Sequence, residues 1–306
     1  MAIRAVASPG TGTPLQEAAV RTTPGPFARV RTGFGENPIA LAGLAFLVLV
    51  VLLAIGAPVT GRYSPTATVL TDFEEPPSAK HWLGTDNAGR DVWSRLVWGS
   101  RNSLSAGVAA VALATTIGML LGAFSGYYGG FADGLLMRVT DAFLAFPGIV
   151  LLLMLASILG PSIVNVALVI GFLGWTGVAR LVRGLFLSLR ERDFALAARA
   201  LGATDWQIIR RHLLPHVVSP VVVSATFLVA FAVLTEAALS YLGLGVRPPA
   251  PSWGVMLADA QTVHVFQEVW WSWLAAGVTL VLLVLAVNYV GETLRRALDP
   301  YGDTSG

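Results

Sequence analysis

The run AFLAFPGIVLLLMLASILGPSIVNVALVIGFLGWTGVA, residues 142–179, contains 38 residues and no charged side chain. As one helix it would be about 57 Å long, nearly twice the thickness of a bilayer's hydrocarbon core, which is about 30 Å. The run must therefore fold back on itself. Gly160, Pro161 and Ser162 lie near its middle, and they favour a turn because proline cannot continue a regular helix and glycine permits a reversal. The run predicts two membrane-spanning helices.

Four more apolar segments lie outside this run, and each is long enough to cross a bilayer: residues 38–61, 102–132, 217–242 and 269–291. The composition agrees, since 55% of the residues are hydrophobic and 12% are charged, against about 45–50% and about 25% in an ordinary soluble domain. A soluble globular protein and a largely disordered chain are both excluded. The expected fold class is an all-α polytopic membrane protein with six transmembrane helices.

The remaining segments complete the expected organisation. Residues 1–37 form a flexible tail, and residues 62–101 form an external loop that ends in RDVWSRLVWGSR, where the apolar side chains share one face and predict an interfacial helix. Residues 102–297 form a five-helix core, which includes a long inner segment at 180–215. Residues 298–306 form a short second tail.

The basic residues give the orientation. Fourteen of the twenty arginine and lysine residues fall on the side of the membrane that holds both tails and the inner segment. Cytoplasmic loops carry an excess of these residues, so both termini are expected in the cytoplasm and the protein in the cell (inner) membrane. A net charge of +2 suits loops that face anionic membrane lipid. An aromatic-and-basic pattern typical of nucleic-acid binding is missing from the sequence.

The inner segment reads as two short helices that meet at a corner. The first is rich in alanine and ends near Leu201, where Gly202 supplies the residue that a left-handed helix terminus needs. The second opens with Thr204 and Gln207 at the spacing of a capping box, and it closes at Pro215. Three of its apolar residues are expected to share one face: Trp206, Ile209 and Leu213.

Two uses of this apolar face are open. It can pack against the inner ends of the protein's own helices, which is the usual fate of an amphipathic loop. Ala197, Ala198 and Gly202 favour the other use, because a strip of small side chains allows the close approach of a second surface. The segment is then a plug for the groove of another protein.

The stretch LAARALGATDWQIIRRHLLPH, residues 196–216, resembles the EAA loop of ABC importer permeases. In that family an Ala-Ala pair, a glycine four residues later and a His-x-x-Pro form the coupling helix, which docks into a nucleotide-binding subunit. Leu196 stands where the family motif has glutamate, and a leucine side chain forms no salt bridge. The resemblance assigns the coupling role to Ala197, Ala198, Gly202, Ala203, Asp205, Trp206, Ile209, His212 and Pro215.

Further segments resemble the dipeptide, oligopeptide and nickel branch of these permeases, in particular the subunit with an amino-terminal extension. They are HWLGTDNAGRDVWSRLVWGSRNSL (81–104), GYYGG (126–130), MRVTDAFLAFPG (137–148), LTEAALSYLGLG (234–245) and PPAPSWGVML (248–257). The resemblance implies a type I ABC importer permease fold and the transport of di- or oligopeptides or a related small solute. It also implies three kinds of partner: a second homologous permease subunit, two nucleotide-binding ATPase subunits and an extracytoplasmic solute-binding protein.

The chain offers no site of its own for nucleotide energy. A phosphate-binding G-x-x-x-x-G-K-[ST] loop needs a lysine, and the single lysine, Lys80, lies on the expected outer side. ATP is therefore expected on partner subunits, and this chain is expected to hold no cofactor and no catalytic residue. His212 and His216 have a zinc-like spacing, but Pro215 lies between them, so no metal site is expected. The absence of cysteine excludes thiolate sites.

Two residues within the spans are candidates for the translocation pathway. Glu236 is an acid near the interior of a predicted span, where a carboxylate is costly and by default functional. A structural role close to the outer interface is the equal alternative. Trp175 can contact the solute, although packing is the commoner use of such a residue. If Glu236 instead couples to an ion gradient, the protein is a secondary transporter, which is the alternative function.

Overall fold

The computed structural model of the chain describes residues 26–298, and in that part the structure is built from helices. Five helical segments are long and apolar enough to span a membrane: α2 (Pro38–Ile55), α4 (Val92–Tyr128), α7 (Ile163–Leu189), α10 (Leu214–Tyr241, continuous with the helix from Asp205) and α13 (Trp271–Leu298). A bent pair, α5 (Gly130–Ala145) and α6 (Gly148–Leu159), provides the sixth span when it is counted as one. The predicted all-α, polytopic fold class is confirmed.

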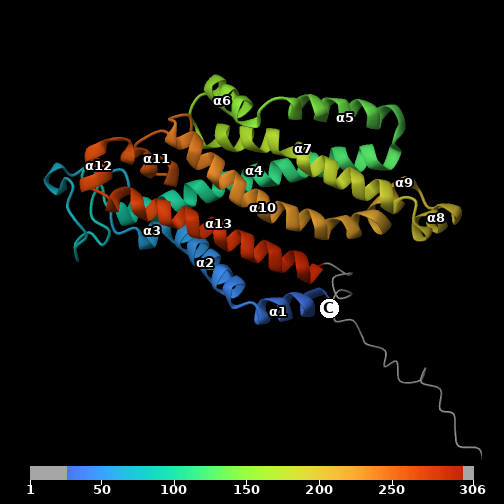
Figure 1. Ribbon diagram of the computed structural model, residues 1–306, viewed down its shortest axis with the longest axis horizontal. Coiled ribbons are helices and arrows are strands. Elements are labelled where there is room, and N and C mark those ends of the chain that lie inside the picture. Colours follow the sequence, from blue (N-terminus) through green and yellow to red (C-terminus); the bar gives the residue numbers. More distant parts are fainter. Residues whose placement is uncertain (1–25, 299–306) are drawn as a thin grey trace, which may run out of the picture.

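The long helices lie side by side along the longest axis of the molecule (Figure 1). One end carries the short helices α8 (Asp193–Ala200) and α9 (Asp205–Gln207), and the helix α1 (Pro26–Glu36) lies beside the last turns of α13. The opposite end carries α3 (Ala57–Thr60), α11 (Trp253–Ala258), α12 (Val263–Glu268) and the loop that precedes α4. Two short 3-10 turns also lie among these outer segments, η1 (Leu70–Asp72) and η3 (Asp259–Gln261).

The predicted reversal at Gly160, Pro161 and Ser162 is confirmed, because α6 ends at Leu159 and α7 begins at Ile163. The start of the third span was placed wrongly at residue 142. Helix α5 begins at Gly130, and α6 is bent from it by 88° at the Phe146-Pro147 break. The last charged residue was a poor guide to the start of this span, because acids of α5 pair with arginines of α7. Asp133 lies 2.5 Å from Arg183, and Asp141 lies 2.5 Å from Arg180.

The predicted interfacial helix is also wrong. Residues 92–101 form the first turns of α4, a single helix of 37 residues. Asp91 caps this helix by accepting a hydrogen bond from the Ser94 amide at 2.7 Å. The apolar side chains of these turns pack inside the protein rather than on lipid: Val92 and Val97 are buried, and Gly99 lies against Ser252 and Trp253.

The amino-terminal tail is shorter than predicted. Residues 26–36 of the expected flexible tail form α1, which packs beside α13: a Cβ at Gly33 would lie 3.6 Å from Thr293. Residues 1–25 and 299–306, the rest of the two predicted tails, lie outside the described part of the chain. Asn37 then starts α2, since its side chain accepts a hydrogen bond from the Ala40 amide.

Helices α4 and α7 pack closely along their length, and glycines set their spacing. A Cβ atom at Gly118 would lie 2.6 Å from Val178 Cβ, and one at Gly122 would lie 2.5 Å from the carbonyl oxygen of Ala179. Such distances are far inside van der Waals contact, so no larger residue fits without moving a helix. Small residues that allow helix backbones to approach closely are typical of membrane helix packing.

Candidate coupling site

The inner corner begins where α7 ends and α8 follows. Gly202 terminates α8 with a φ of +83°, a left-handed conformation that glycine adopts without strain. The Ala203 amide then donates to the Ala198 carbonyl at 3.0 Å, which satisfies a terminal carbonyl of the helix. The predicted left-handed glycine at this corner is confirmed.

The capping box is confirmed as well. The Gln207 side chain accepts a hydrogen bond from the Thr204 amide at 2.9 Å, and the Thr204 hydroxyl accepts one from the Gln207 amide at 3.4 Å. Two of the orphan amides at the start of α9 are therefore satisfied by local side chains. The corner between α8 and α9 is thus fixed by its own sequence on both sides.

The second short helix does not close at Pro215. It continues from α9 through a π-helical turn, η2 (Ile208–Leu213), directly into α10. The Leu214 amide bonds to the Ile209 carbonyl, five residues back. Proline lacks an amide hydrogen and therefore interrupts the helical hydrogen-bond pattern. The wide π turn lies directly before Pro215, so the interruption falls beside it and the helix continues through the proline.

The predicted apolar face is correct for Ile209 and Leu213, which pack in one cluster, and wrong for Trp206. Ile208 and Leu213, five residues apart, point into the protein and are buried, together with Ala195 of α8, in a cluster that includes Phe186. Trp206 lies on the other side and is 67% exposed. The sequence left two uses of the inner segment open, and the structure gives each use its own face. One face packs on the protein's own helices, and the other face is exposed.

We call the exposed surface of the α8–α9 corner the free face, and it carries three large apolar side chains. Leu196, Leu201 and Trp206 are exposed, Leu201 to 88%. Ala197 and Gly202 are exposed beside them, and a Cβ at Gly202 would meet nothing within 4 Å. The other residues assigned to coupling are arranged around this face: Asp205 and Pro215 are exposed, and Ala198, Ala203, Ile209 and His212 are half-buried.

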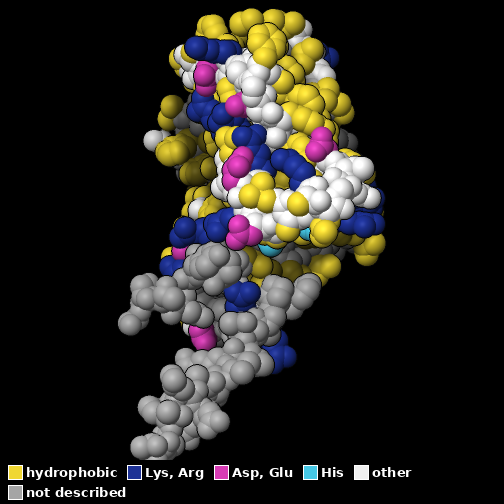
Figure 2. Space-filling model, turned by 90° about the vertical axis from the view of Figure 1, so that its right-hand side faces the viewer, with side chains coloured by type: hydrophobic (Ala, Val, Ile, Leu, Met, Phe, Trp, Pro, Cys, Tyr) yellow, Lys and Arg dark blue, Asp and Glu magenta, His cyan; other side chains and the backbone are white. Residues whose placement is uncertain are grey.

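Figure 2 shows this end of the molecule, where arginine and acidic side chains form a band among apolar ones.

Two residues at this end could not be predicted from the sequence as part of the corner. Arg190 donates to the carbonyl oxygens of Gly126 and Tyr127, both at 3.0 Å. The hydroxyl of Tyr127 donates to Asp205 at 2.6 Å. The GYYGG turn, which contains Tyr127, was the available signal, but the sequence does not show that this turn meets the corner.

Glu236 is completely buried where α10 meets α4 and α11. One carboxylate oxygen accepts a hydrogen bond from Ser240 at 2.7 Å, and the hydroxyls of Ser103 and Ser252 lie beside the same group. The other oxygen, Oε2, has no hydrogen-bond partner among the described residues. These contacts support the structural alternative, in which Glu236 joins three helices; its role in a pathway stays a prediction.

The structure places Trp175 away from both Glu236 and the coupling corner. It is buried in α7, and its ring meets the ring of Phe143 from α5 edge-on, with centroids 5.9 Å apart. These contacts suit packing between two helices. Contact of Trp175 with a solute stays a prediction.

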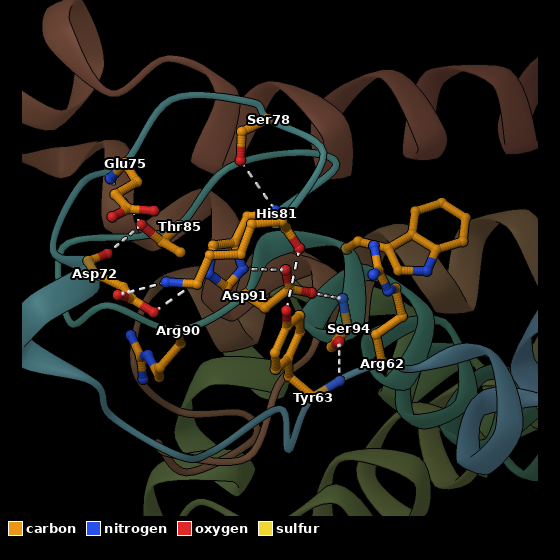
Figure 3. A network of polar contacts seen from close by, with 12 residues as sticks. Arg62, Tyr63, Asp72, Glu75, Ser78, His81, Thr85, Arg90, Asp91 and Ser94 are labelled. Carbon is orange, nitrogen blue, oxygen red and sulfur yellow. Dashed lines mark hydrogen bonds and ion pairs between the residues drawn. The ribbon is translucent and has the colours of Figure 1, made fainter.

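The loop before α4 is held by a polar network at the end of the molecule opposite α8 and α9 (Figure 3). His81 lies between two carboxylates, 2.8 Å from Asp91 and 3.4 Å from Asp72. The ammonium group of Lys80 lies 2.8 Å from Asp72, and this contact lowers the pKa of the Asp72 carboxyl below its ordinary value. Because Asp91 also caps α4, the network fixes the outer loop to the start of that helix.

Comparisons with known proteins agree on one family. A family model described as "binding-protein-dependent transport system inner membrane component" matches residues 118–301, and one described as "N-terminal TM domain of oligopeptide transport permease C" matches residues 25–77. A peptide permease protein of Brucella suis biovar 1 is 43% identical over 282 residues, which cover 92% of this chain and 93% of that protein. The dipeptide transport system permease protein DppC of Alkalihalophilus pseudofirmus is 41% identical over 265 residues, 87% of this chain and 86% of that one.

Solved structures agree on the fold. A chain of the MetNI methionine ABC transporter in an inward facing conformation matches with a TM-score of 0.52 at 21% sequence identity, over 67% of this chain and 97% of that one. A second crystal form of the same transporter matches with a TM-score of 0.51 at 22% identity. At this identity the match supports the shared helical architecture alone.

Proposed function

The chain belongs to the family of inner membrane components of binding-protein-dependent transport systems and is a permease subunit of an ABC importer, and from this premise we propose that its inner corner is the surface through which ATPase subunits drive transport. The observation that carries the proposal is the free apolar face at the α8–α9 corner. Leu196, Leu201 and Trp206 are exposed on short helices beyond the spans, where contact with a partner protein gives them burial.

The proposal includes the partner set. A second homologous permease subunit completes the pathway, two ATPase subunits bind ATP and dock on the corners, and a solute-binding protein delivers the solute from outside. Both termini then lie in the cytoplasm, together with α1, α8 and α9. The arginine excess on this side of the sequence supports that orientation.

The proposed solute is a di- or oligopeptide, or a small molecule of related chemistry. The support is that relatives 41–43% identical over most of the chain are named peptide and dipeptide permeases. No covalent chemistry is assigned to this subunit, and ATP is bound and hydrolysed by its partners.

The corner suits the transfer of a rigid-body movement. Gly202 and the capping box fix its bend, and Ile208 and Leu213 anchor it in the core, so a push on the free face displaces the corner as a unit. Closure of the ATPase pair on ATP would then favour one access state of the pathway. ATP can shift that equilibrium only as far as its binding energy differs between the two states, so the docked corner must differ between them.

The proposal is tested with the complete complex in vesicles. We expect solute accumulation that requires ATP and the ATPase subunits and that continues after an uncoupler has removed the ion gradient. Accumulation by this chain alone, or accumulation that the uncoupler abolishes while ATP is present, would establish the secondary transporter instead.

Removing the apolar anchor of the free face should weaken docking. We expect Trp206→Ala to lower solute-stimulated ATP hydrolysis about tenfold, which corresponds to about 1.4 kcal/mol, because tryptophan is enriched among the residues that contribute most to the binding energy of an interface. Trp270→Ala is the matched control, since Trp270 is half-exposed and lies between α12 and α13, far along the chain from the corner. Equal rates in the two variants would contradict the docking role.

Glu236→Gln separates the two transport mechanisms. The amide oxygen of glutamine can still accept the hydrogen bond from Ser240, so we expect ATP-driven uptake to stay within about threefold of the unchanged protein. An ion-coupled carrier that used Glu236 would lose uptake entirely. The measurement is the initial uptake rate in vesicles with equal amounts of inserted complex.

A further inference from the structure

The hydroxyl group of Tyr127 connects three helices at the inner corner. Tyr127 is the second-last residue of α4, and its side chain is only 5% exposed. Its hydroxyl donates to Asp205 of α9 at 2.6 Å and accepts a hydrogen bond from Arg199 of α8 at 3.2 Å. The guanidinium carbon of Arg199 also lies 5.8 Å from the centre of the Tyr127 ring. Both helices of the corner are therefore joined to α4 through one side chain.

We propose that Tyr127 is a positioning residue that makes α4 move with the coupling corner. The inference rests on the proposed function, because it takes the corner as the surface on which ATPases act. The chain itself attaches the corner to α7 on one side and to α10 on the other. Tyr127 adds α4, the third helix, by hydrogen bonds to two charged partners, which are stronger than neutral ones.

Because α4 is long, a link to its last turn connects the coupling corner with the opposite end of the molecule. Arg95 lies 32 positions before Tyr127 in this helix, or about 48 Å along its axis. Arg95 is buried at the outer end, with Nε 3.2 Å from Asp86 and Nη2 3.6 Å from Asp259 of η3. Asn102 donates to the carbonyl oxygen of Pro251 at 2.7 Å, just before α11. One continuous helix thus joins the ATPase side to the segments that cover the outer end.

A second contact shows that the hydroxyl can be removed without releasing the turn. Arg190 holds the carbonyl oxygens of Gly126 and Tyr127, and these backbone bonds do not involve the tyrosine side chain. The ring of Tyr127 packs in the cluster around Phe186, and phenylalanine keeps that ring. Tyr127→Phe therefore removes the hydrogen bonds to Asp205 and Arg199 and leaves the packing, including the contact of Arg199 with the ring.

The test compares two neighbouring tyrosines in the complete complex in vesicles. Tyr127→Phe is expected to insert normally and to keep ATP hydrolysis without solute-binding protein within about twofold. Stimulation by the loaded solute-binding protein and the number of solute molecules moved per ATP should both fall about tenfold, the loss typical of a charge-assisted hydrogen bond. Tyr128→Phe, at an exposed tyrosine of the same turn, should behave like the unchanged complex.

A double variant shows whether Tyr127 acts through Asp205. If it does, Tyr127→Phe with Asp205→Asn should be no worse than the more affected single variant, whereas independent effects would multiply. The proposal is overturned if Tyr127→Phe couples normally, if the two losses multiply, or if uptake falls only in proportion to the amount of inserted protein. An unchanged complex that shows no ATP-dependent uptake would instead overturn the proposed function, and this inference with it.

Discussion

Replacing Gly202 by tryptophan should abolish the stimulation of ATP hydrolysis by solute while the protein still inserts in the membrane. Gly202 is exposed and a Cβ there meets nothing within 4 Å, so an added side chain enlarges the surface of the corner. Gly202 also has a φ of +83°, which costs a non-glycine residue about 1–2 kcal/mol and tends to change the bend. Both effects disturb the docked surface. The measurement is ATP hydrolysis by the complete complex with and without loaded solute-binding protein.

Gly202→Asn is the matched control for this experiment. Asparagine tolerates the left-handed conformation better than other side chains and is much smaller than tryptophan. We expect it to retain most of the stimulation. If the tryptophan variant also remains fully coupled, the surface around Gly202 is not the one that meets the ATPase, and the proposed function loses its main support.

The second large effect is expected from Gly122→Leu, which should strongly destabilise the folded protein. The first side-chain atom alone would lie 2.5 Å from the Ala179 carbonyl oxygen and 2.8 Å from Val182 Cβ. Backbone cannot yield as a flexible side chain does, so α4 and α7 must separate along their shared contact. Overpacking of this kind costs about 1–3 kcal/mol in soluble cores, and we expect more for leucine at a backbone contact.

Gly177→Leu provides the comparison within the same pair of helices. Gly177 lies on the exposed side of α7, and a Cβ there meets nothing within 4 Å. The thermal unfolding midpoint of the purified complex should fall by about 10 °C or more for Gly122→Leu, at about 2–4 °C per kcal/mol. It should change little for Gly177→Leu. A similar midpoint in both would mean that the close packing of α4 on α7 does not limit stability.

These two predictions use different kinds of information about glycine. The role of Gly202 was visible in the sequence, since a glycine after an alanine-rich helix marks a left-handed terminus. The role of Gly122 was not, because one glycine among many apolar residues does not show which helix lies against it. That knowledge required the position of Ala179, 57 residues further along the chain.

Local interactions explain which features could be predicted from the amino-acid sequence. Hydrophobic length predicted the spans, the Gly160–Ser162 turn predicted their reversal, and the spacing of Thr204 and Gln207 predicted the capping box. Each depends on residues within a few positions of one another, or on the free energy of moving a segment from water into lipid. Such features can therefore be predicted without knowing which segments of the chain pack together.

Tertiary structure decided the rest, because the remaining features depend on contacts between distant segments. The acids of α5 can lie in a span because arginines of α7 neutralise them, and the first turns of α4 are buried because α11 covers them. The π turn at Ile208–Leu213 follows from packing those two side chains into the core while Pro215 stays within the helix. Tyr127 and Asp205 are 78 residues apart, and only the folded chain brings them within 2.6 Å.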